Sequence, residues 1–303
     1  MRVTVLLGGP SAEREVSLRS GKAVADGLRS MGHEVFESDI APAKLAGLDH
    51  PADVVFPVLH GQFGESGELQ DILESRGLAF VGAGSKASRL GINKAATKKA
   101  WEKAGLPTPK YEVLTANGAP RPTLPALSAP CVVKALDSGS SIDVYLCKTD
   151  EDARKAVADV LKKHGRVLVE QFIKGPELTV GLLEEQPLAP MRIVPTREFF
   201  DYQAKYSDAT TEHRFDTGLP ADVNEACREL AREANAAVGA IDLARIDMMI
   251  DGQNRPYLLE INTLPGFTSV SLLPEAARHA GIEFGPLVDR LVKRAFARGP
   301  RRG

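Results

Sequence analysis

The stretch ARIDMMIDGQNRPYLLEINTLPGFTS (residues 244–269) contains two runs of strand-forming residues separated by the polar turn DGQNRP. Alternate residues of a strand point to the same face of its sheet. Glu260 and Asn262 therefore share one face. Leu259 and Ile261 are expected on the opposite face. Because the turn residues are of the kind that closes a hairpin, the stretch predicts two antiparallel strands with oxygen-bearing side chains on one side.

The centre of the turn sets the pairing register of this hairpin. A turn centred between residues 253 and 254 places Asp247 opposite Glu260 and Arg245 opposite Asn262, all on one face. Two carboxylates and an amide oxygen form a hard-oxygen site suited to Mg²⁺, which takes one or two carboxylates plus phosphates and water. Facing carboxylates repel unless a cation is close by. The pattern favours a metal site; the alternative is that both acids pair only with Arg245 and solvent.

Composition restricts the class of protein. The 303 residues include 38 basic and 40 acidic side chains, so bulk charge indicates neither a nucleic-acid partner nor a membrane surface. Small-molecule partners are expected. The three cysteines are scattered, without metal-ligand spacing, which favours a reduced, cytoplasmic compartment. We expect neither a signal peptide nor a membrane span, because no cleavage site follows the first apolar run and no stretch approaches about 20 apolar residues.

The order of elements predicts an α/β part followed by α+β parts. The first part alternates strands with a helix and predicts an open, mostly parallel sheet. Expected strands there are 2–9, 33–40, 52–61 and 77–82, with a helix over 15–32. Beyond residue 93 we expect helices over 93–105, 150–165 and 224–240, and strands over 131–136, 144–148, 166–173 and 174–183. We predict three domains: an N-terminal substrate-binding domain (1–92), a central domain (93–174) and a C-terminal catalytic domain (175–303).

Two lysines are candidates for binding phosphates. Lys134 ends an apolar strand just before the flexible loop SGSS, whose backbone amides could close over a polyphosphate. Lys94 opens a helix, where the helix end and the ammonium both favour an anion. Each lysine alone is more typical of a solvated surface. The chain has neither a Walker pattern nor a dinucleotide-binding glycine fingerprint.

The stretch VLVEQFIKGPELTV (residues 167–180) offers two acids around a Gly-Pro turn. As a nucleotide hinge, it would present backbone groups of Gln171, Phe172 and Ile173 to an adenine edge and Glu177 to ribose hydroxyls. As an ordinary turn between strands, it needs no ligand.

These motifs together resemble the D-alanine–D-alanine ligase family of the ATP-grasp superfamily. The resemblance covers nearly the whole chain, through VLLGGPSAEREVSLRSG, HGQFGESGELQ, KALDSGSSIDV, LVEQFIKGPELTV, EFFDYQAKY and LLEINTLPGFTSVSLLP. It implies a three-domain ATP-grasp architecture with ATP bound between the central and C-terminal domains. It also implies ligation of two D-alanine molecules through an acyl phosphate, with release of ADP and phosphate, for peptidoglycan synthesis.

The resemblance also implies roles for individual residues. Asp247, Glu260 and Asn262 would bind two Mg²⁺ ions, or Mn²⁺; Lys94 and Lys134 would hold the phosphates; Glu170 and Glu177 would contact adenine and ribose. Glu13, with His60 nearby, would receive the ammonium of the first substrate, and Arg245 and the Gly266 amide would form an oxyanion site. Ser271 and Leu272 would bind the carboxylate of the second D-alanine. Ser140 and Tyr206 would link a lid, residues 198–215, to Glu13. A homodimer is expected as well.

One departure from the family and several rival functions remain open. The family commonly has Gly where this chain has Asp143, so an extra acid beside the phosphate loop is expected to alter ATP affinity or loop closure. The rivals are a ligase using D-lactate or D-serine as second substrate, another ATP-grasp carboxylate–amine ligase, and a nucleotide-binding regulator without turnover. Arg245 argues against a regulator, because a sensor has no use for an oxyanion donor.

Overall fold

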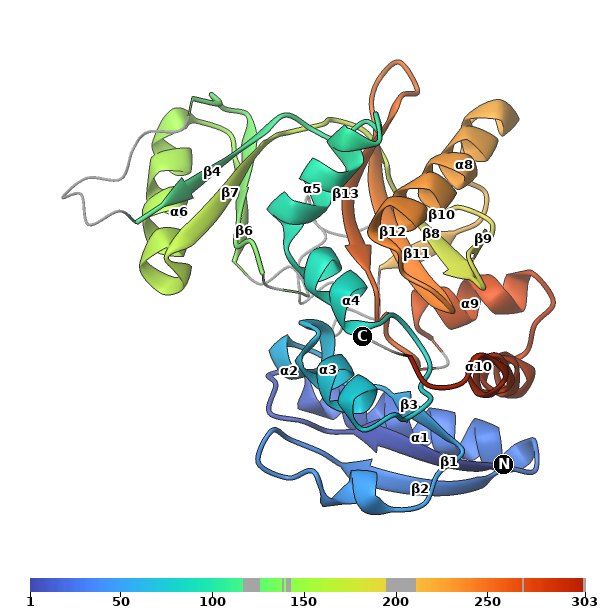
Figure 1. The fold of residues 1–303 in the computed structure, drawn as a ribbon. Coiled ribbons are helices and arrows are strands. Elements are labelled where there is room, and N and C mark those ends of the chain that lie inside the picture. The colour runs from blue at the N-terminus through green and yellow to red at the C-terminus, as the bar shows by residue number, and fades with distance from the viewer. Residues whose placement is uncertain (117–125, 138, 140–142, 195–210, 269, 302–303) are drawn as a thin grey trace.

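The computed structural model describes residues 1–116, 126–137, 139, 143–194, 211–268 and 270–301. Figure 1 shows three sheets, each formed by a consecutive part of the chain and each with its own helices. The N-terminal sheet lies at the bottom, the central sheet at the upper left and the C-terminal sheet at the upper right. The N-terminal sheet has parallel strands in the order β2 (Glu34–Asp39), β1 (Arg2–Leu7), β3 (Val54–Pro57). The expected strand over 77–82 is wrong in its length, because only a bridge from Val55 to Phe80 forms there. The accompanying helices are α1 (Arg14–Ser30), the 3₁₀ turn η1 (Ala46–Asp49), α2 (Gln62–Glu65), α3 (Glu68–Ser75) and α4 (Ser85–Ile92).

The central sheet is antiparallel, with the strand order β4-β7-β5-β6. Its strands are β4 (Tyr111–Thr115), β5 (Cys131–Lys134), β6 (Val144–Cys147) and β7 (Arg166–Gln171), preceded by α5 (Lys94–Lys103). Helix α6 (Asp150–His164) starts with a capping box between Thr149 and Asp152 and packs its buried face on this sheet. Strand β4 lies in the Pro-rich connector. It was not among the predicted strands, because the prolines interrupt the alternation of apolar and polar residues there.

The C-terminal sheet is also antiparallel, in the order β11-β10-β8-β12-β13, and β9 pairs with β8. Its strands are β8 (Glu177–Leu183), β9 (Gln186–Pro187), β10 (Met191–Val194), β11 (Glu212–Arg214), β12 (Leu243–Ile250) and β13 (Pro256–Asn262). Helix α8 (Ala221–Val238) packs against this sheet. Helices α9 (Leu272–His279) and α10 (Phe284–Arg298) follow. In the described ranges, no helix is long and apolar enough to cross a membrane.

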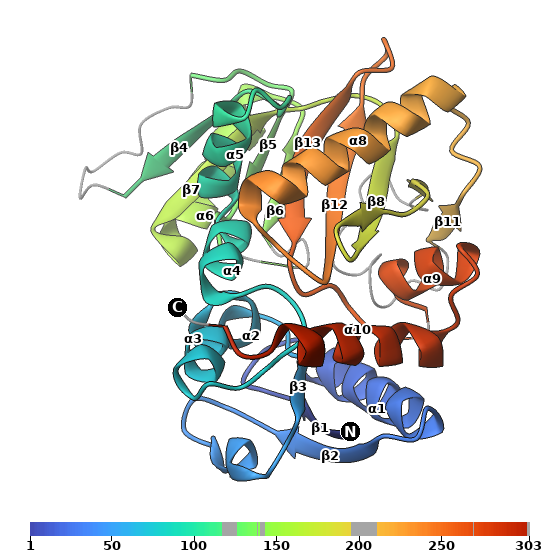
Figure 2. The ribbon, with the colours of Figure 1, turned by 45° about the vertical axis from the view of Figure 1, so that its right-hand side comes forward.

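The last helix returns to the first sheet. Leu287, Val288 and Leu291 of α10 belong to one buried cluster with Val5 of β1 and Leu28 of α1. Figure 2 shows α10 running between α1 and the C-terminal sheet. The N-terminal core therefore needs a segment from the other end of the chain, since Leu287 lies 259 residues after Leu28 and 282 after Val5. The three predicted domain ranges stay a prediction, and α10 packs across two of them.

The β12–β13 hairpin has the expected register at its functional end. Asp247 lies opposite Glu260, and Arg245 opposite Asn262. Towards the turn the register shifts after Asp247, so that Met248 pairs with Leu258. This bulge corrects the expected core face: Leu258, rather than Leu259, joins Ile261 in the buried cluster of the C-terminal sheet.

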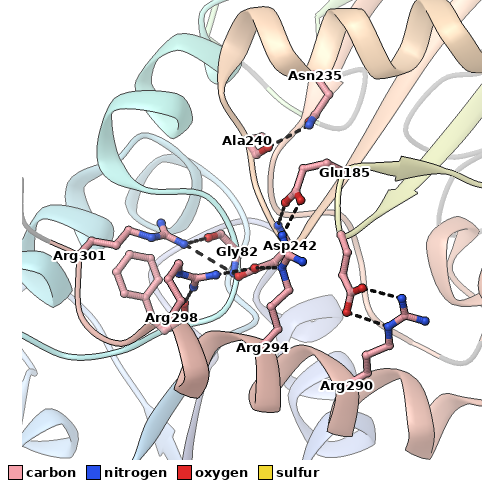
Figure 3. A network of polar contacts seen from close by, with 11 residues as sticks. Gly82, Glu185, Asn235, Ala240, Asp242, Arg290, Arg294, Arg298 and Arg301 are labelled. Atoms are coloured by element: carbon pink, nitrogen blue, oxygen red, sulfur yellow. Dashed lines mark hydrogen bonds and ion pairs between the residues drawn. The ribbon is translucent and has the colours of Figure 1, made fainter.

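A buried carboxylate ties α10 to both the first and the third sheet. Asp242 is fully buried, and Figure 3 shows arginines from the end of the chain converging on it. Its Oδ1 accepts from Arg298 Nη1 at 2.6 Å and Arg294 Nε at 3.1 Å, while Oδ2 accepts from the Gly82 amide at 2.9 Å. The Glu185 carboxylate accepts from the Asp242 amide at 2.9 Å. One side chain therefore holds the end of α10 and the loop before α4 in place.

We expect Asp242→Asn to destabilise the protein strongly. The amide keeps the size of the side chain but removes the buried negative charge that the partly exposed arginines share, and loss of one partner from such a network costs about 3–5 kcal/mol. The melting temperature should fall by about 10 °C in calorimetry. The matched control is Asp26→Asn, whose exposed pairs with Lys22 and Arg29 should contribute little. Equal melting temperatures for the two variants would rule out a structural role for the network.

Candidate active site

A cavity of about 460 Å³ lies where the N-terminal helices meet the β12–β13 hairpin. It brings together segments from the start, middle and end of the chain. Nine residues selected from sequence line it: Glu13, His60, Lys94, Arg245, Glu260, Asn262, Gly266, Ser271 and Leu272. The fold therefore gathers most of the residues predicted for substrate, oxyanion and metal, but Asp247 and Lys134 do not line the cavity, and each role stays a prediction.

Cations already pair with the acids of the hairpin. Arg245 donates from Nε and Nη2 to the two oxygens of Asp247, at 2.9 and 2.7 Å, and the Thr179 hydroxyl donates to Oδ1 at 2.6 Å. The Lys94 ammonium lies 3.4 Å from Glu260 Oε2. Repulsion between the facing carboxylates is thus relieved by one cation on each acid. This arrangement corresponds in part to the alternative in which the acids pair with Arg245.

The donor set is chemically suitable for Mg²⁺. No group of three or more His, Cys, Asp or Glu side chains in the described part of the chain could hold a metal ion. The hairpin nevertheless offers two carboxylates and, beside them, Asn262, whose Oδ1 accepts from the Leu264 amide at 3.0 Å. Mg²⁺ commonly completes such a set with phosphates and water. A divalent ion would compete with Arg245 and Lys94 for these carboxylates.

Both phosphate-binding candidates are buried rather than solvated. Lys94 is the first residue of α5 and Lys134 the last of β5, and each is only 7% exposed. The Asn93 side chain caps α5 by accepting from the Ala96 amide at 2.9 Å. The Lys134 ammonium forms an ion pair with Glu170. Each buried ammonium group therefore has a carboxylate beside it, Glu260 for Lys94 and Glu170 for Lys134.

The predicted nucleotide hinge lies at the edge between the central and C-terminal sheets. Gln171 ends β7, Phe172 donates its amide to the Pro130 carbonyl at 3.3 Å, and Glu177 begins β8. None of these residues lines the cavity, and neither does the buried Ile173. The Glu170 carboxylate turns inward to Lys98 and Lys134, so its expected contact with adenine, like that of Glu177 with ribose, stays a prediction.

The N-terminal side of the cavity is acidic. Glu13 is 5% exposed and precedes α1, and His60 lies nearby with its Nδ1 3.9 Å from Glu65 Oε1. Burial alone lowers the pKa of His60, but the Glu65 and Glu13 carboxylates outweigh it and leave that pKa raised. Glu65 also accepts from the Gly61 amide at 2.7 Å. Carboxylates in this position suit a substrate ammonium.

The opposite side of the cavity suits a carboxylate. Ser271 is the N-cap residue of α9 and Leu272 its first residue, as expected. Ser271 Oγ accepts from the Thr268 amide at 3.0 Å, which fixes the loop that follows Gly266. A helix N-terminus presents unpaired amides and a positive dipole end to an anion.

Among the ionisable lining residues, sequence reasoning missed Glu65, Arg19 on α1 and His213 on β11. Glu65 lies in the motif HGQFGESGELQ and Arg19 in the motif SAEREVSLRSG. Only the tertiary structure shows that both residues line the cavity. Ser140, Tyr206 and lid residues 198–210 lie outside the described residues. The end of the predicted lid is not a loop, because residues 212–214 form β11 and pair with β10.

The extra acid beside the phosphate loop is already neutralised. Asp143 accepts from Lys163 at 2.8 Å and pairs with His164 at 2.7 Å, both at the end of α6, and these partners lower its pKa. Its φ is +55°, a conformation that favours Gly or Asp. The backbone therefore explains why Gly suits this position. The expectation that Asp143 alters ATP affinity or loop closure stays a prediction.

Comparison with known proteins agrees with this geometry. Residues 38–83 match the family model for the D-ala D-ala ligase N-terminus, and residues 100–293 that for its C-terminus. D-alanine–D-alanine ligases of Gloeobacter violaceus and Desulforudis audaxviator are 42% and 43% identical to the chain, covering 98% of it and 100% and 99% of their own lengths. The crystal structure of the Bacillus anthracis D-alanine–D-alanine ligase aligns over 98% of both chains with a TM-score of 0.86 at 31% identity. The same enzyme complexed with ATP aligns over 98% of this chain and 97% of its own, with a TM-score of 0.83 at 30% identity. The chain belongs to the D-alanine–D-alanine ligase family.

Proposed function

We propose that the chain joins two D-alanine molecules to D-alanyl-D-alanine, using ATP and releasing ADP and phosphate, for peptidoglycan synthesis. The observation that carries the proposal is the single cavity that holds an acidic side around Glu13, a cationic side chain at Arg245 and a helix N-terminus at Ser271. An amino acid needs complementary groups at both ends, and two such molecules must lie side by side to be joined.

The two steps make different demands on the residues. In the first, the carboxylate of one D-alanine attacks the γ-phosphate of ATP, which forms the acyl phosphate and releases ADP. This transfer calls for positioning and charge neutralisation rather than a protein nucleophile. Lys94 and Lys134 supply positive charge for this step. In the second, the amine of the other D-alanine attacks the acyl phosphate and displaces phosphate. Arg245 and the Gly266 amide would stabilise the developing oxyanion, each by about 3 kcal/mol.

Other parts of the proposal concern the metal, the nucleotide and the cell. Asp247, Glu260 and Asn262 would hold Mg²⁺, which when bound supplies charge neutralisation beside the phosphates. The backbone of residues 171–173 and Glu177 would receive adenine and ribose between the central and C-terminal sheets. We further propose a cytoplasmic homodimer; three free, buried thiols support a reducing compartment.

One assay tests the proposed reaction. ADP release should be measured with D-alanine, L-alanine, D-lactate and D-serine as sole or second substrate, with identification of each product. We expect D-alanyl-D-alanine from D-alanine alone, and no ADP with L-alanine. An ester or a D-alanyl-D-serine product in preference to the dipeptide would instead assign the rival second substrates. ATP binding without any ADP release would indicate a regulator.

Glu260→Gln should abolish most turnover while leaving the fold intact. The side chain is partly exposed, and glutamine keeps its size and an oxygen that can accept from Lys94, so we expect the fold to be retained. The lost negative charge weakens binding of Mg²⁺, and several kcal/mol of lost neutralisation lowers the rate constant about a thousandfold. Steady-state kinetics at saturating Mg²⁺ give the measurement. The exposed Glu225→Gln serves as control, and near-normal turnover of the Glu260 variant would exclude a metal role.

Tyr206→Phe should alter the choice of second substrate. The family resemblance implies that its hydroxyl reaches Ser140 and, through it, Glu13 when the lid closes. Removing the hydroxyl leaves a partner unsatisfied, at about 1–3 kcal/mol. We expect normal ATP binding, slower dipeptide formation and measurable ester formation with D-lactate. The ester share should increase at lower pH, where the amine of D-alanine is more fully protonated. A competition assay across pH measures this ratio; an unchanged ratio means that Tyr206 plays no part in specificity.

A further inference from the structure

Lys98 is a fully buried charge that the proposed mechanism does not use. It lies on α5, one turn after Lys94, and its side chain is 0% exposed. Its ammonium donates to the Thr108 hydroxyl at 2.5 Å and to the Leu258 carbonyl of β13 at 3.4 Å. Figures 1 and 2 both show α5 beside β13, next to the central sheet. Burying an ammonium is expensive unless it is paired, so its partner indicates its purpose.

That partner is Glu170, in the middle of the central sheet. Glu170 is 2% exposed, and its two carboxylate oxygens form ion pairs with Lys98 and Lys134, one each. Burial raises the pKa of Glu170, but the two ammonium groups outweigh it and leave that pKa below its usual value. The carboxylate is therefore ionised. Burial lowers the pKa of Lys98 to about 8, with Glu170 opposing this effect, so Lys98 is still largely protonated at neutral pH. The group then carries two positive charges and one negative charge, and one lysine is in excess.

The two lysines differ in what else they can reach. Lys98 is enclosed by α5, β7 and β13, and it lies over the Tyr111 ring at 5.7 Å from the centroid. It therefore cannot contact a ligand. Lys134 ends β5, and it is one of the two lysines proposed to hold the phosphates of ATP. A Lys134 that alone neutralised Glu170 would be held back from an anion, because an unpaired buried carboxylate is strongly unfavourable.

We propose that Lys98 is a positioning residue for nucleotide binding: by neutralising Glu170 from behind, it leaves the Lys134 ammonium available to the phosphates of ATP. This inference rests on the proposed function in one respect, namely that the site binds ATP. It adds a role for a lysine that touches no substrate. It also gives Glu170 a task, the orientation of Lys134, besides any contact with adenine.

The test compares ATP dissociation constants of four variants with the wild-type protein by calorimetry. Lys98→Met should weaken ATP binding at least tenfold, because Glu170 then retains Lys134. Lys99→Met, an exposed neighbour on the same helix, should bind as the wild type does. Glu170→Gln removes the carboxylate that competes for Lys134. In the Lys98→Met/Glu170→Gln double variant, the dissociation constant should stay within about threefold of Glu170→Gln alone.

Each outcome has one meaning. Equal ATP affinities of Lys98→Met and Lys99→Met would overturn the inference. It would equally fall if Lys98→Met weakened binding tenfold in the Glu170→Gln background, since Lys98 would then act by another route. This second comparison remains informative if Lys98→Met alone fails to fold, because the double variant removes the buried carboxylate together with the lysine that neutralises it. Absence of ATP binding by the wild-type protein would refute the proposed function instead.

A ligand series separates positioning from general damage to the site. Displacement of a fluorescent ATP analogue by ATP and by adenosine should show a tenfold weaker ATP but unchanged adenosine in Lys98→Met. Adenosine lacks phosphates and does not need Lys134. Equal weakening of both ligands would show that Lys98 only maintains the shape of the site, contrary to the proposal.

Discussion

The antiparallel pairing of β12 and β13 is the constraint on which the site depends. A shift of one residue would turn every side chain of one strand to the other face. Asp247 opposite Glu260 requires the register that the structure shows, and the bulge after Asp247 confines the irregularity to the turn side. The functional end thus keeps regular alternation, while the bulge lets Leu258 and Ile261, three residues apart, enter the same core. The bulge thus allows the geometry of the site and the packing of the core to coexist in one hairpin.

Much of the fold could be predicted because its signals are local. Alternation and helical spacing gave β1, α1, α6 and the paired strands, and turn chemistry located the hairpin. The bulge could not be predicted, since it depends on which leucine packs better against α8 and its neighbours. The return of α10 to the first sheet is a contact between the two ends of the chain, and no local pattern encodes it. Strand β4 was also not predicted, because the prolines of the surrounding connector interrupt the alternating pattern that indicates a strand.

The site divides in the same way. Residue types and spacing on one hairpin indicated Asp247, Glu260 and Arg245, because strand pairing makes their proximity calculable. Arg19, Glu65 and His213 reach the cavity from three separate elements, so only tertiary packing reveals them. The burial of Lys94 and Lys134 was also unexpected, since isolated lysines are normally solvated. Charge compensation by Glu260 and Glu170 makes that burial tolerable.

Compensation of this kind is a recurring solution in the molecule. In the hairpin, Asp247 and Glu260 each pair with one cation. Glu170 pairs with two lysines, and Asp242 pairs with arginines of α10. Such networks stabilise less than an apolar core of the same volume would, because desolvation offsets most of the attraction. The networks differ in whether a ligand is expected to replace one of the partners. Around Asp242 every partner is supplied by the fold, so that network is structural. Around Glu170 and Glu260 the lysines stand where an anion is expected. Glu170 has two lysines, so one positive charge there remains for a ligand to neutralise.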